Sequence, residues 1–369
     1  MKLQIVTAVV LGLPFAMVAQ PKLPAQADVS GMPMMVIEMK PGDTQLIRSQ
    51  PPSEGTRWLD FDALSISTRY RHVESLLGTT TASNVQHQIA VRGSLRLDAA
   101  GRLTIRAGLF SGDTFTGGWN NTGPGTGATQ SKLFLKRLYL DAEPARGIEV
   151  QFGGLEFSRG ESTEITSYDY DGYLVGERLA LHRADRVYFD EITATYGYVG
   201  DLYQPSVFRR LAQVNRSNYH QFGLSKHIGK RIRVSADYTF ESGSDTLRQA
   251  VTFHAPELRV ADLLHFEQYE RAGADAGYGF SMYGEKKLGR RISVGPGYAQ
   301  LDRRGLYSDR FNVGKRFFWN SHIALGPEWS VMALATYAVS APVGSATRTR
   351  FDLILSYDIL HRLRAARLV

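Results

Sequence analysis

The chain has 369 residues, a formal net charge of +7 and no cysteine. The lack of cysteine excludes disulfide scaffolds, thiolate metal sites, cysteine nucleophiles and lipoprotein anchoring. With 36 Gly, 18 Tyr and 18 Phe against 21% charged residues, the composition excludes a disordered chain and favours an all-β protein. The basic residues are scattered and form no run, so we expect no nucleic-acid partner.

The N-terminus has the pattern of an export signal. Lys2 is followed by an apolar stretch, and Ala25 and Ala27 supply the small positions that a signal peptidase requires. A membrane-anchor helix is the alternative, but it would need about 20 apolar residues, and Pro14 interrupts the run. We therefore expect residues 1–27 to be a signal peptide that is removed on export.

The segment that follows differs in composition from the rest of the chain. Residues 28–56 are rich in proline, glycine and methionine and show no sustained period, so we interpret them as a periplasmic tail or linker. After residue 27 no uninterrupted apolar run is long enough to cross a bilayer as a helix. The mature chain is therefore either soluble outside the inner membrane or spans a membrane as strands.

Beyond residue 57, apolar and polar residues alternate in one segment after another, as in strands with one apolar face. The clearest segment places these side chains on one face: Ile232, Val234, Ala236, Tyr238 and Phe240. We count about sixteen such segments, with fourteen or eighteen as alternatives. Short connections follow the even-numbered segments: residues 98–101, 143–147, 182–185, 227–230, 256–259 and 287–290. Several odd-numbered connections are longer: residues 112–130, 158–172 and 200–216.

This rhythm of short and long connections favours an outer-membrane barrel, which has short periplasmic turns and long outer loops. A soluble β-sandwich is the alternative. Its Greek-key connections would disturb the rhythm, and one sandwich of about 300 residues would be large. We predict an all-β fold: a transmembrane antiparallel up-and-down β-barrel over residues 57–369, located in the cell outer membrane.

One hairpin resembles the Gram-negative porins, loosely including the phosphate-selective and alginate-export types. It consists of residues 132–144, with the sequence KLFLKRLYLDAEP, and residues 147–154, with the sequence GIEVQFGG. The resemblance implies a passive diffusion channel for small hydrophilic solutes, contact with outer-membrane lipid and lipopolysaccharide, and a homotrimer. The C-terminus departs from the family, whose members usually end on an aromatic residue, because this chain continues beyond Tyr357 to Val369.

Five arginines share the predicted lumen-facing parity in the first four segments: Arg69, Arg71, Arg92, Arg106 and Arg137. The last three are expected near mid-height, and the first two extend this basic row towards the outer mouth. A row of guanidinium groups beside water raises the local concentration of anions and slows cations. The alternative is structural, since these arginines could pair with Asp141, Glu149 and acids of the third long connection.

The third long connection, residues 158–172, carries five charged residues: Arg159, Glu161, Glu164, Asp169 and Asp171. The resemblance implies that it folds inward and narrows the pore, so its acids would face the basic row across a constriction. Residues 169–172, with the sequence DYDG, could bind calcium, but they lack the remaining ligand positions of a calcium loop. We interpret them as an Asp-Gly turn and expect no metal and no cofactor.

Motifs of enzymes are absent from the sequence, including the G-x-S-x-G elbow and H-E-x-x-H. His87 and His220 share the lipid-facing parity, so we assign no catalytic residue and do not expect an enzyme. Two alternatives to the porin stay open: a barrel enzyme of the lipase or protease type, and a non-conducting structural or adhesion barrel. The apolar, inward Met332, Leu334 and Ala338 favour the latter.

Overall fold

The computed structural model describes residues 58–114, 117–168, 173–182, 188–201, 203–255, 257–273, 276–302, 313–340 and 347–366. The predicted signal peptide (1–27) and tail (28–56) lie outside these residues. No helix in the described part of the chain is long and apolar enough to cross a bilayer.

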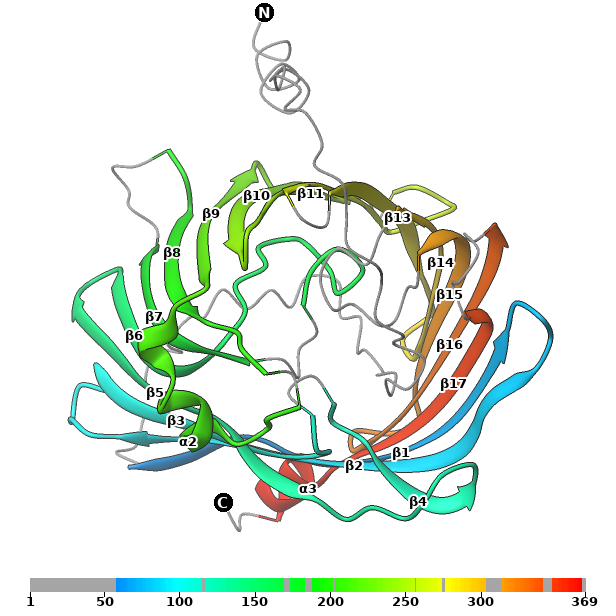
Figure 1. Cartoon of the computed structure of the whole chain (residues 1–369), viewed down its shortest axis with the longest axis horizontal. Helices are drawn as coiled ribbons and strands as arrows, with labels where there is room; N and C mark the ends of the chain where they lie inside the picture. Colours follow the sequence, from blue (N-terminus) through cyan, green and yellow to red (C-terminus); the bar gives the residue numbers. More distant parts are fainter. Residues whose placement is uncertain are drawn as a thin grey trace, which may run out of the picture. The chain divides into compact units, whose positions relative to one another are not determined.

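Most of the described residues belong to strands of one sheet (Figure 1). The strands are β1 (Leu59–Ser75), β2 (Thr80–Arg96), β3 (Leu103–Ser111), β4 (Asn120–Gly125), β5 (Leu133–Ala145), β6 (Ile148–Glu156), β7 (Tyr173–His182), β8 (Glu191–Tyr198), β9 (Tyr219–Ile228), β10 (Ile232–Glu241), β11 (Ser244–His254), β12 (Leu263–Gly273), β13 (Gly277–Leu288), β14 (Ile292–Leu301), β15 (Gly314–Ala324), β16 (Trp329–Ser340) and β17 (Thr347–Asp358). The helices are α2 (Val207–Leu211), the 3-10 helix η1 (Val214–Arg216) and α3 (Ile359–Ala365).

The sheet closes on itself as a transmembrane barrel of 16 antiparallel strands, which confirms the predicted fold class. Leaving β4 aside, each strand pairs with the next, so that β3 pairs with β5, and β1 pairs with β17 to close the ring. The seventeenth strand, β4, is a short addition from the loop between β3 and β5. It pairs with the outer part of β2, where β3 has already ended.

The predicted alternation of faces is confirmed in β10. Tyr238 and Phe240 are 49% and 37% exposed on the outside of the barrel, whereas Asp237 and Thr239 are 6% and 0% exposed inside it. Successive side chains of a strand point to opposite faces of the sheet. The apolar face of the segment therefore points out of the barrel, and its polar face lines the lumen.

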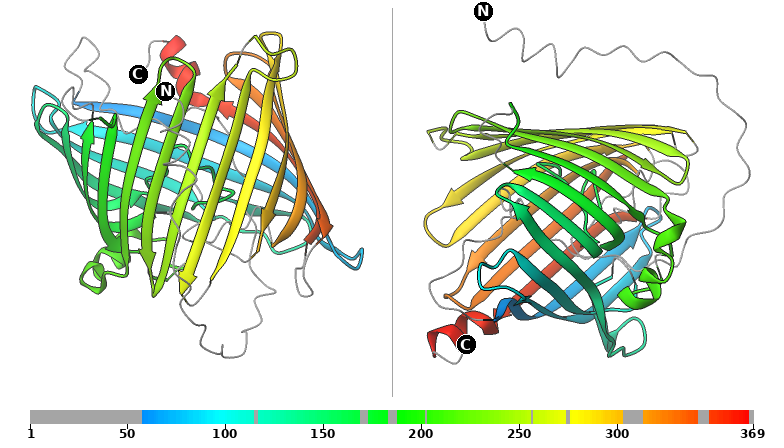
Figure 2. Two further views of the ribbon diagram at one scale, coloured as in Figure 1. Left: turned by 90° about the horizontal axis from the view of Figure 1, so that it is seen from above. Right: turned by 90° about the vertical axis from the view of Figure 1, so that its left-hand side faces the viewer.

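The described chain continues beyond its last strand, β17, as a short helix. β17 ends at Asp358, whose side chain accepts a hydrogen bond from the backbone N–H of His361 at 2.9 Å and caps α3. Arg364 of α3 lies 3.4 Å from Asp60 of β1. The last described residues are thus a helix beside the barrel, at the opposite end from α2 (Figure 2).

The connections follow the predicted rhythm only in part. β7 and β8 are separated by residues 183–190, and β11 and β12 by residues 255–262, so both connections are longer than the predicted turns. At the other end of the barrel, β10 and β11 are joined by Ser242 and Gly243 alone. Both of these have positive φ angles, 49° and 87°. A two-residue turn with two positive φ angles twists in the same sense as the strands that it joins. It closes a tight hairpin at the end of the barrel where the sequence predicts longer loops.

Candidate pore constriction

The outer part of the predicted basic row lies where β1 meets β17. Arg69 and Arg71 are both buried on the inner face of β1. Nε of Arg71 donates to Oδ1 of Asp352 at 2.8 Å, and Nε of Arg350 donates to Oδ2 of the same carboxylate at 2.7 Å. Nε of Arg69 donates to the side-chain oxygen of Gln86 at 2.8 Å. Three arginines and one carboxylate therefore share this strip of the wall.

The other three arginines of the row lie on β2, β3 and β5. Nε of Arg106 donates to Asp141 Oδ2 at 2.8 Å, and Arg137 Nη1 lies 2.5 Å from Glu156 Oε1. The guanidinium carbon of Arg92 lies 5.2 Å from the centre of the Phe110 ring. Arg106 and Arg137 thus sit in ion pairs within the wall, and Arg92 stacks on an aromatic ring.

Gly108 makes room for this packing. It lies opposite Arg92 on β2 and opposite Arg137 on β5. A Cβ atom at this position would come within 2.5 Å of the Phe110 ring and 3.2 Å of Arg137 Cβ. The glycine therefore lets Phe110 and the two arginines occupy the same level of the lumen.

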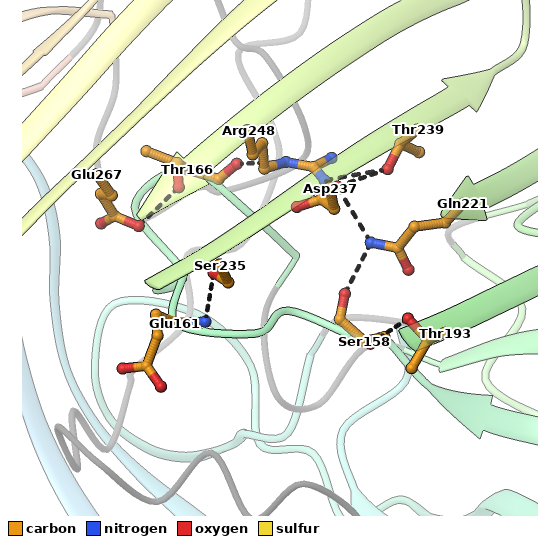
Figure 3. A network of polar contacts seen from close by, with 10 residues as sticks. All are labelled: Ser158, Glu161, Thr166, Thr193, Gln221, Ser235, Asp237, Thr239, Arg248 and Glu267. Atoms are coloured by element: carbon orange, nitrogen blue, oxygen red, sulfur yellow. Dashed lines mark hydrogen bonds and ion pairs between the residues drawn. The ribbon is translucent and has the colours of Figure 1, made fainter. Parts of the chain in front are cut away.

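The loop between β6 and β7 folds into the barrel and is bound to the inner faces of β10 and β12 (Figure 3). The backbone N–H of Glu161 donates to Ser235 Oγ at 2.7 Å. The carboxylate of Glu267 accepts from the backbone N–H of Thr163 at 2.6 Å and from Thr166 Oγ1 at 2.7 Å. These bonds join residues about 70 to 100 positions apart in the chain and keep the loop inside the lumen.

Strands β9 and β11 hold the two ends of the same loop segment. Nε of Arg248 donates to the carbonyl oxygen of Thr166 at 3.0 Å, and its guanidinium also pairs with Asp237. The side-chain amide of Gln221 donates to the carbonyl oxygen of Ser158 at 2.8 Å and to Asp237 Oδ1 at 3.2 Å. Asp237 therefore positions Gln221 and Arg248, the two side chains that bind the loop (Figure 3). None of these bonds joins Asp237 itself to the loop.

Apolar contacts complete the attachment. The rings of Phe157 and Tyr168, at the two ends of the described loop, stack with centres 3.9 Å apart. Ile165 is buried in a cluster with Leu263 and Phe318 on the wall. The loop is thus packed against the wall as well as hydrogen-bonded to it, which resists its release into solvent.

The charged residues predicted in this loop have different surroundings. Arg159 and Glu164 are both buried, with 3.7 Å between their charged groups. Glu161 is half-buried, and its carboxylate points away from Ser235 and β10 (Figure 3). Asp169 and Asp171 lie outside the described residues. Of the two described acids of the loop, Glu161 is therefore the less buried.

A second loop, between β3 and β5, also reaches the inner wall. Its Trp119 packs against Met332 of β16 and Ile354 of β17. The ring of Trp119 also lies 4.2 Å from the guanidinium carbon of Arg69. The apolar inward side chain of Met332 is thus covered by a loop residue rather than by lumen water.

Several residues that build this region were not among the predicted site residues: Trp119, Asp237, Arg248, Glu267, Arg350 and Asp352. Except for Trp119, they lie at polar positions of alternating strands, so strand parity places them inside the barrel. Parity does not indicate which loop or strand they contact. No sequence pattern marked Trp119, because its apolar partners Met332 and Ile354 lie more than 200 residues away along the chain.

Groups suited to metal binding are not found in the described residues. The DYDG turn that we considered for calcium, residues 169–172, lies outside them. The histidines singled out in the sequence lie on the outer face of the barrel: His220, for example, packs against Tyr196 with ring centres 4.7 Å apart.

Comparisons with known proteins identify the fold. No family model matches the sequence, and no curated protein matches it. The structure resembles OmpF of Salmonella typhi, solved in complex with daunomycin, with a TM-score of 0.54 and 11% identity over 81% of this chain and 97% of that one. It also resembles a mutant porin of Rhodopseudomonas blastica, with a TM-score of 0.51 and 11% identity over 81% of this chain and 99% of that one. The chain therefore has the porin fold.

Proposed function

We propose that this chain is an outer-membrane diffusion channel for small hydrophilic solutes, with a preference for anions. The observation that carries the proposal is the inward loop of residues 157–168, which is bound to the inner faces of β10 and β12 by Ser235 and Glu267. A loop held across a polar lumen narrows it without closing the barrel, so solutes would be selected by size.

The proposed anion preference rests on the basic row. Arg69, Arg71 and Arg350 gather around a single carboxylate, Asp352, on one side of the lumen. Glu161 belongs to the loop that enters from another side. Charges fixed on low-dielectric walls focus the field in the space between them, which raises the local concentration of anions near the arginines.

Planar-bilayer recording tests the proposal. The protein without residues 1–27 would be refolded, inserted and recorded under a salt gradient. We expect discrete conductance steps and a reversal potential in the direction of anion selectivity. Replacing Arg92, Arg106 and Arg137 by serine should move the reversal potential towards cation selectivity, because Asp141 and Glu156 would lose their ion-pair partners.

Arg231→Ser provides a matched control for this variant. Arg231 lies at the turn before β10, is largely exposed and pairs with Glu257, so its loss should leave the selectivity unchanged. An unchanged reversal potential in the triple variant would refute a selectivity role of Arg92, Arg106 and Arg137. It would leave the ion pairs of the row with a structural role only.

A second candidate is a non-conducting barrel, and a specific observation favours it. Both inward loops contribute to buried apolar clusters in the lumen: Phe157 and Tyr168 to one, Ile165 to another and Trp119 to a third. If these clusters fill the cross-section, the folded protein will insert into a bilayer and show no steps. The same recording therefore separates the two candidates.

The enzyme alternative needs a serine, a histidine and an acid at one rim. His182 lies between Glu149 and Glu191, at 2.7 and 3.2 Å. Within the described part of the chain, no hydrogen bond links a serine hydroxyl to a histidine ring, and no observation favours this alternative. From the resemblance alone, we also propose a homotrimer in contact with outer-membrane lipid and lipopolysaccharide.

A further inference from the structure

The short-turn end of the barrel carries exposed cations around its circumference. The hairpin connections that bear them are residues 97–102, 146–147, 229–231, 255–262 and 289–291, and α3 follows β17 at the same end (Figure 2). The exposed lysines and arginines of these segments, which we call the basic rim, are Arg102, Arg146, Lys230, Arg231, Arg259, Arg290, Arg291, Arg362 and Arg364. None of them belongs to the predicted basic row of the lumen or to the proposed constriction.

The acids at this end do not neutralise the basic rim. Three of its arginines pair with an acid: Arg231 with Glu257, Arg362 with Glu328 and Arg364 with Asp60. Other acids of the connections bind residues outside the rim, since Asp98 accepts from the backbone N–H of Leu103 and Asp262 pairs with Lys286. The remaining rim members form no ion pair with a described acid. The rim therefore keeps a net positive charge that faces solvent in the isolated barrel.

Exposed apolar side chains adjoin these cations along the chain. Val260, next to Arg259, is 82% exposed. Leu288 and Ile292, which flank the turn of residues 289–291, are 54% and 38% exposed. Neighbouring basic and apolar side chains are typical of a membrane interface, where the apolar groups enter the acyl region and the cations meet the headgroups.

An aromatic pair marks the membrane boundary at the same end of the barrel. The rings of Trp329, at the start of β16, and Tyr357, near the end of β17, have centres 4.6 Å apart, and Trp329 is 43% exposed. In membrane barrels such rings lie at the headgroup level. Glu328, the residue before Trp329, lies 4.0 Å from Arg362 of the rim. The rim is therefore adjacent to the headgroup level.

We infer that the basic rim binds anionic phospholipid by attracting the net negative charge of its headgroups. The headgroup layer surrounds a membrane barrel in the same way as the rim does, and each cation near an anionic surface adds to the attraction. An anionic polymer of the periplasm would also meet the cations, but it would leave Val260 and Leu288 exposed to water, so the observations favour lipid. The inference deepens the proposed function, whose membrane location it requires, by naming the class of lipid and the end of the barrel that binds it.

Electron spin resonance of the refolded protein in phosphatidylcholine vesicles tests the inference. The probes are spin-labelled phosphatidylglycerol and spin-labelled phosphatidylcholine, and the immobilised fraction of each label gives its relative association constant with the protein. We expect phosphatidylglycerol to associate up to about fivefold more strongly at low salt, the factor that corresponds to one basic residue at an anionic surface. The preference should vanish in 1 M salt, where the Debye length is only about 3 Å.

Variants with equal changes of charge locate the binding surface. The rim variant combines Lys230→Ser, Arg259→Ser, Arg290→Ser and Arg291→Ser, and it should lower the preference to less than about twofold. The matched control removes four exposed cations from the opposite end of the barrel, by Arg209→Ser, Arg216→Ser, Lys315→Ser and Arg348→Ser, and should keep the preference of the wild type. Arg290→Lys with Arg291→Lys should also keep it, because the charge is retained. The mobility of unheated samples in dodecyl sulfate gels shows that each variant is folded.

Equal association of the two labels with the wild type would overturn the inference, as would a preference that persists in 1 M salt or equal losses in the rim and control variants. Binding to isolated peptidoglycan without any lipid preference would assign the rim to that polymer instead. None of these measurements needs an open pore. A lipid preference without conductance would therefore refute only the channel, and conductance without a preference would refute only the lipid-binding rim. Failure to insert into vesicles would refute the membrane location on which both depend.

Discussion

Two parts of the inner wall use buried carboxylates for different purposes. On β17, Asp352 binds Arg71 of the adjacent strand β1 and Arg350 of its own strand, so it joins the two ends of the barrel. On β12, Glu267 binds Thr163 and Thr166, which belong to a loop and not to the wall. The first carboxylate therefore stabilises the ring, and the second positions what lies inside it. Mutation should therefore be able to weaken the attachment of β1 to β17 without releasing the loop from the wall, and the reverse.

The largest effect is expected from Asp352→Asn. Both Asp352 and Arg350 are fully buried, and removing one partner of a buried ion pair typically costs about 3–5 kcal/mol. We expect the variant to unfold at a markedly lower temperature, measured as the transition between the folded and unfolded gel mobility in dodecyl sulfate. The loop of residues 157–168 should stay resistant to chymotrypsin, since none of its described bonds involves Asp352.

Asp358→Asn serves as the control for this variant, because Asp358 lies at the exposed end of the same strand and caps only α3. Equal unfolding temperatures for Asp352→Asn and the wild type would contradict the role of Asp352 in closing the ring. Cleavage of the loop in Asp352→Asn would contradict the separation of the two regions.

Glu267→Ala should have the converse effect, with a smaller change in the stability of the barrel. The substitution removes an acceptor of bonds from Thr163 and Thr166, and each bond to a charged group contributes about 1.5–3 kcal/mol. We expect chymotrypsin to cleave the variant within the loop, at Phe157 or Tyr168, while the gel-shift temperature changes little. Open-channel current, if present, should become noisier.

Glu270→Ala is the matched control, because Glu270 lies on β12 but is exposed on the outer face. If the loop of the Glu267→Ala variant resists chymotrypsin as well as the wild-type loop does, the apolar contacts of Phe157 and Ile165 suffice to hold it. Glu267 would then have no positioning role.

The sequence predicts which side chains face the lumen much better than it predicts what these side chains contact. Period-2 alternation identified the strands and placed Arg71 and Arg106 inside, because the faces of a strand depend only on its own residues. The partners Asp352 and Glu267 depend on register and on the path of a loop, which are set by contacts between residues far apart in the chain. Likewise, β4 and the cover of Met332 by Trp119 arise from a loop whose sequence has no strand period.

The smallest effect is expected at the short-turn end of the barrel, where Asp190 precedes β8. Burial raises the pKa of Asp190, but hydrogen bonds from the backbone and ring of His227, together with nearby Lys226, outweigh burial and lower this pKa below its usual value. A carboxyl group with a lowered pKa stabilises the folded state above the unfolded pKa, about 3.9, and this stabilisation is lost as the pH falls through the folded pKa.

Asp190→Asn should therefore lower the gel-shift temperature slightly at pH 7, by the equivalent of at most about 1 kcal/mol, since the pair is partly exposed and screened by solvent. The difference from the wild type should shrink as the pH falls below about 4 and vanish once Asp190 is protonated in the folded protein. A difference that stays constant down to this pH would assign the effect to the neutral hydrogen bonds of the side chain and not to its charge. The ends of the barrel would then rely on turn geometry rather than on the ion pairs that hold its interior.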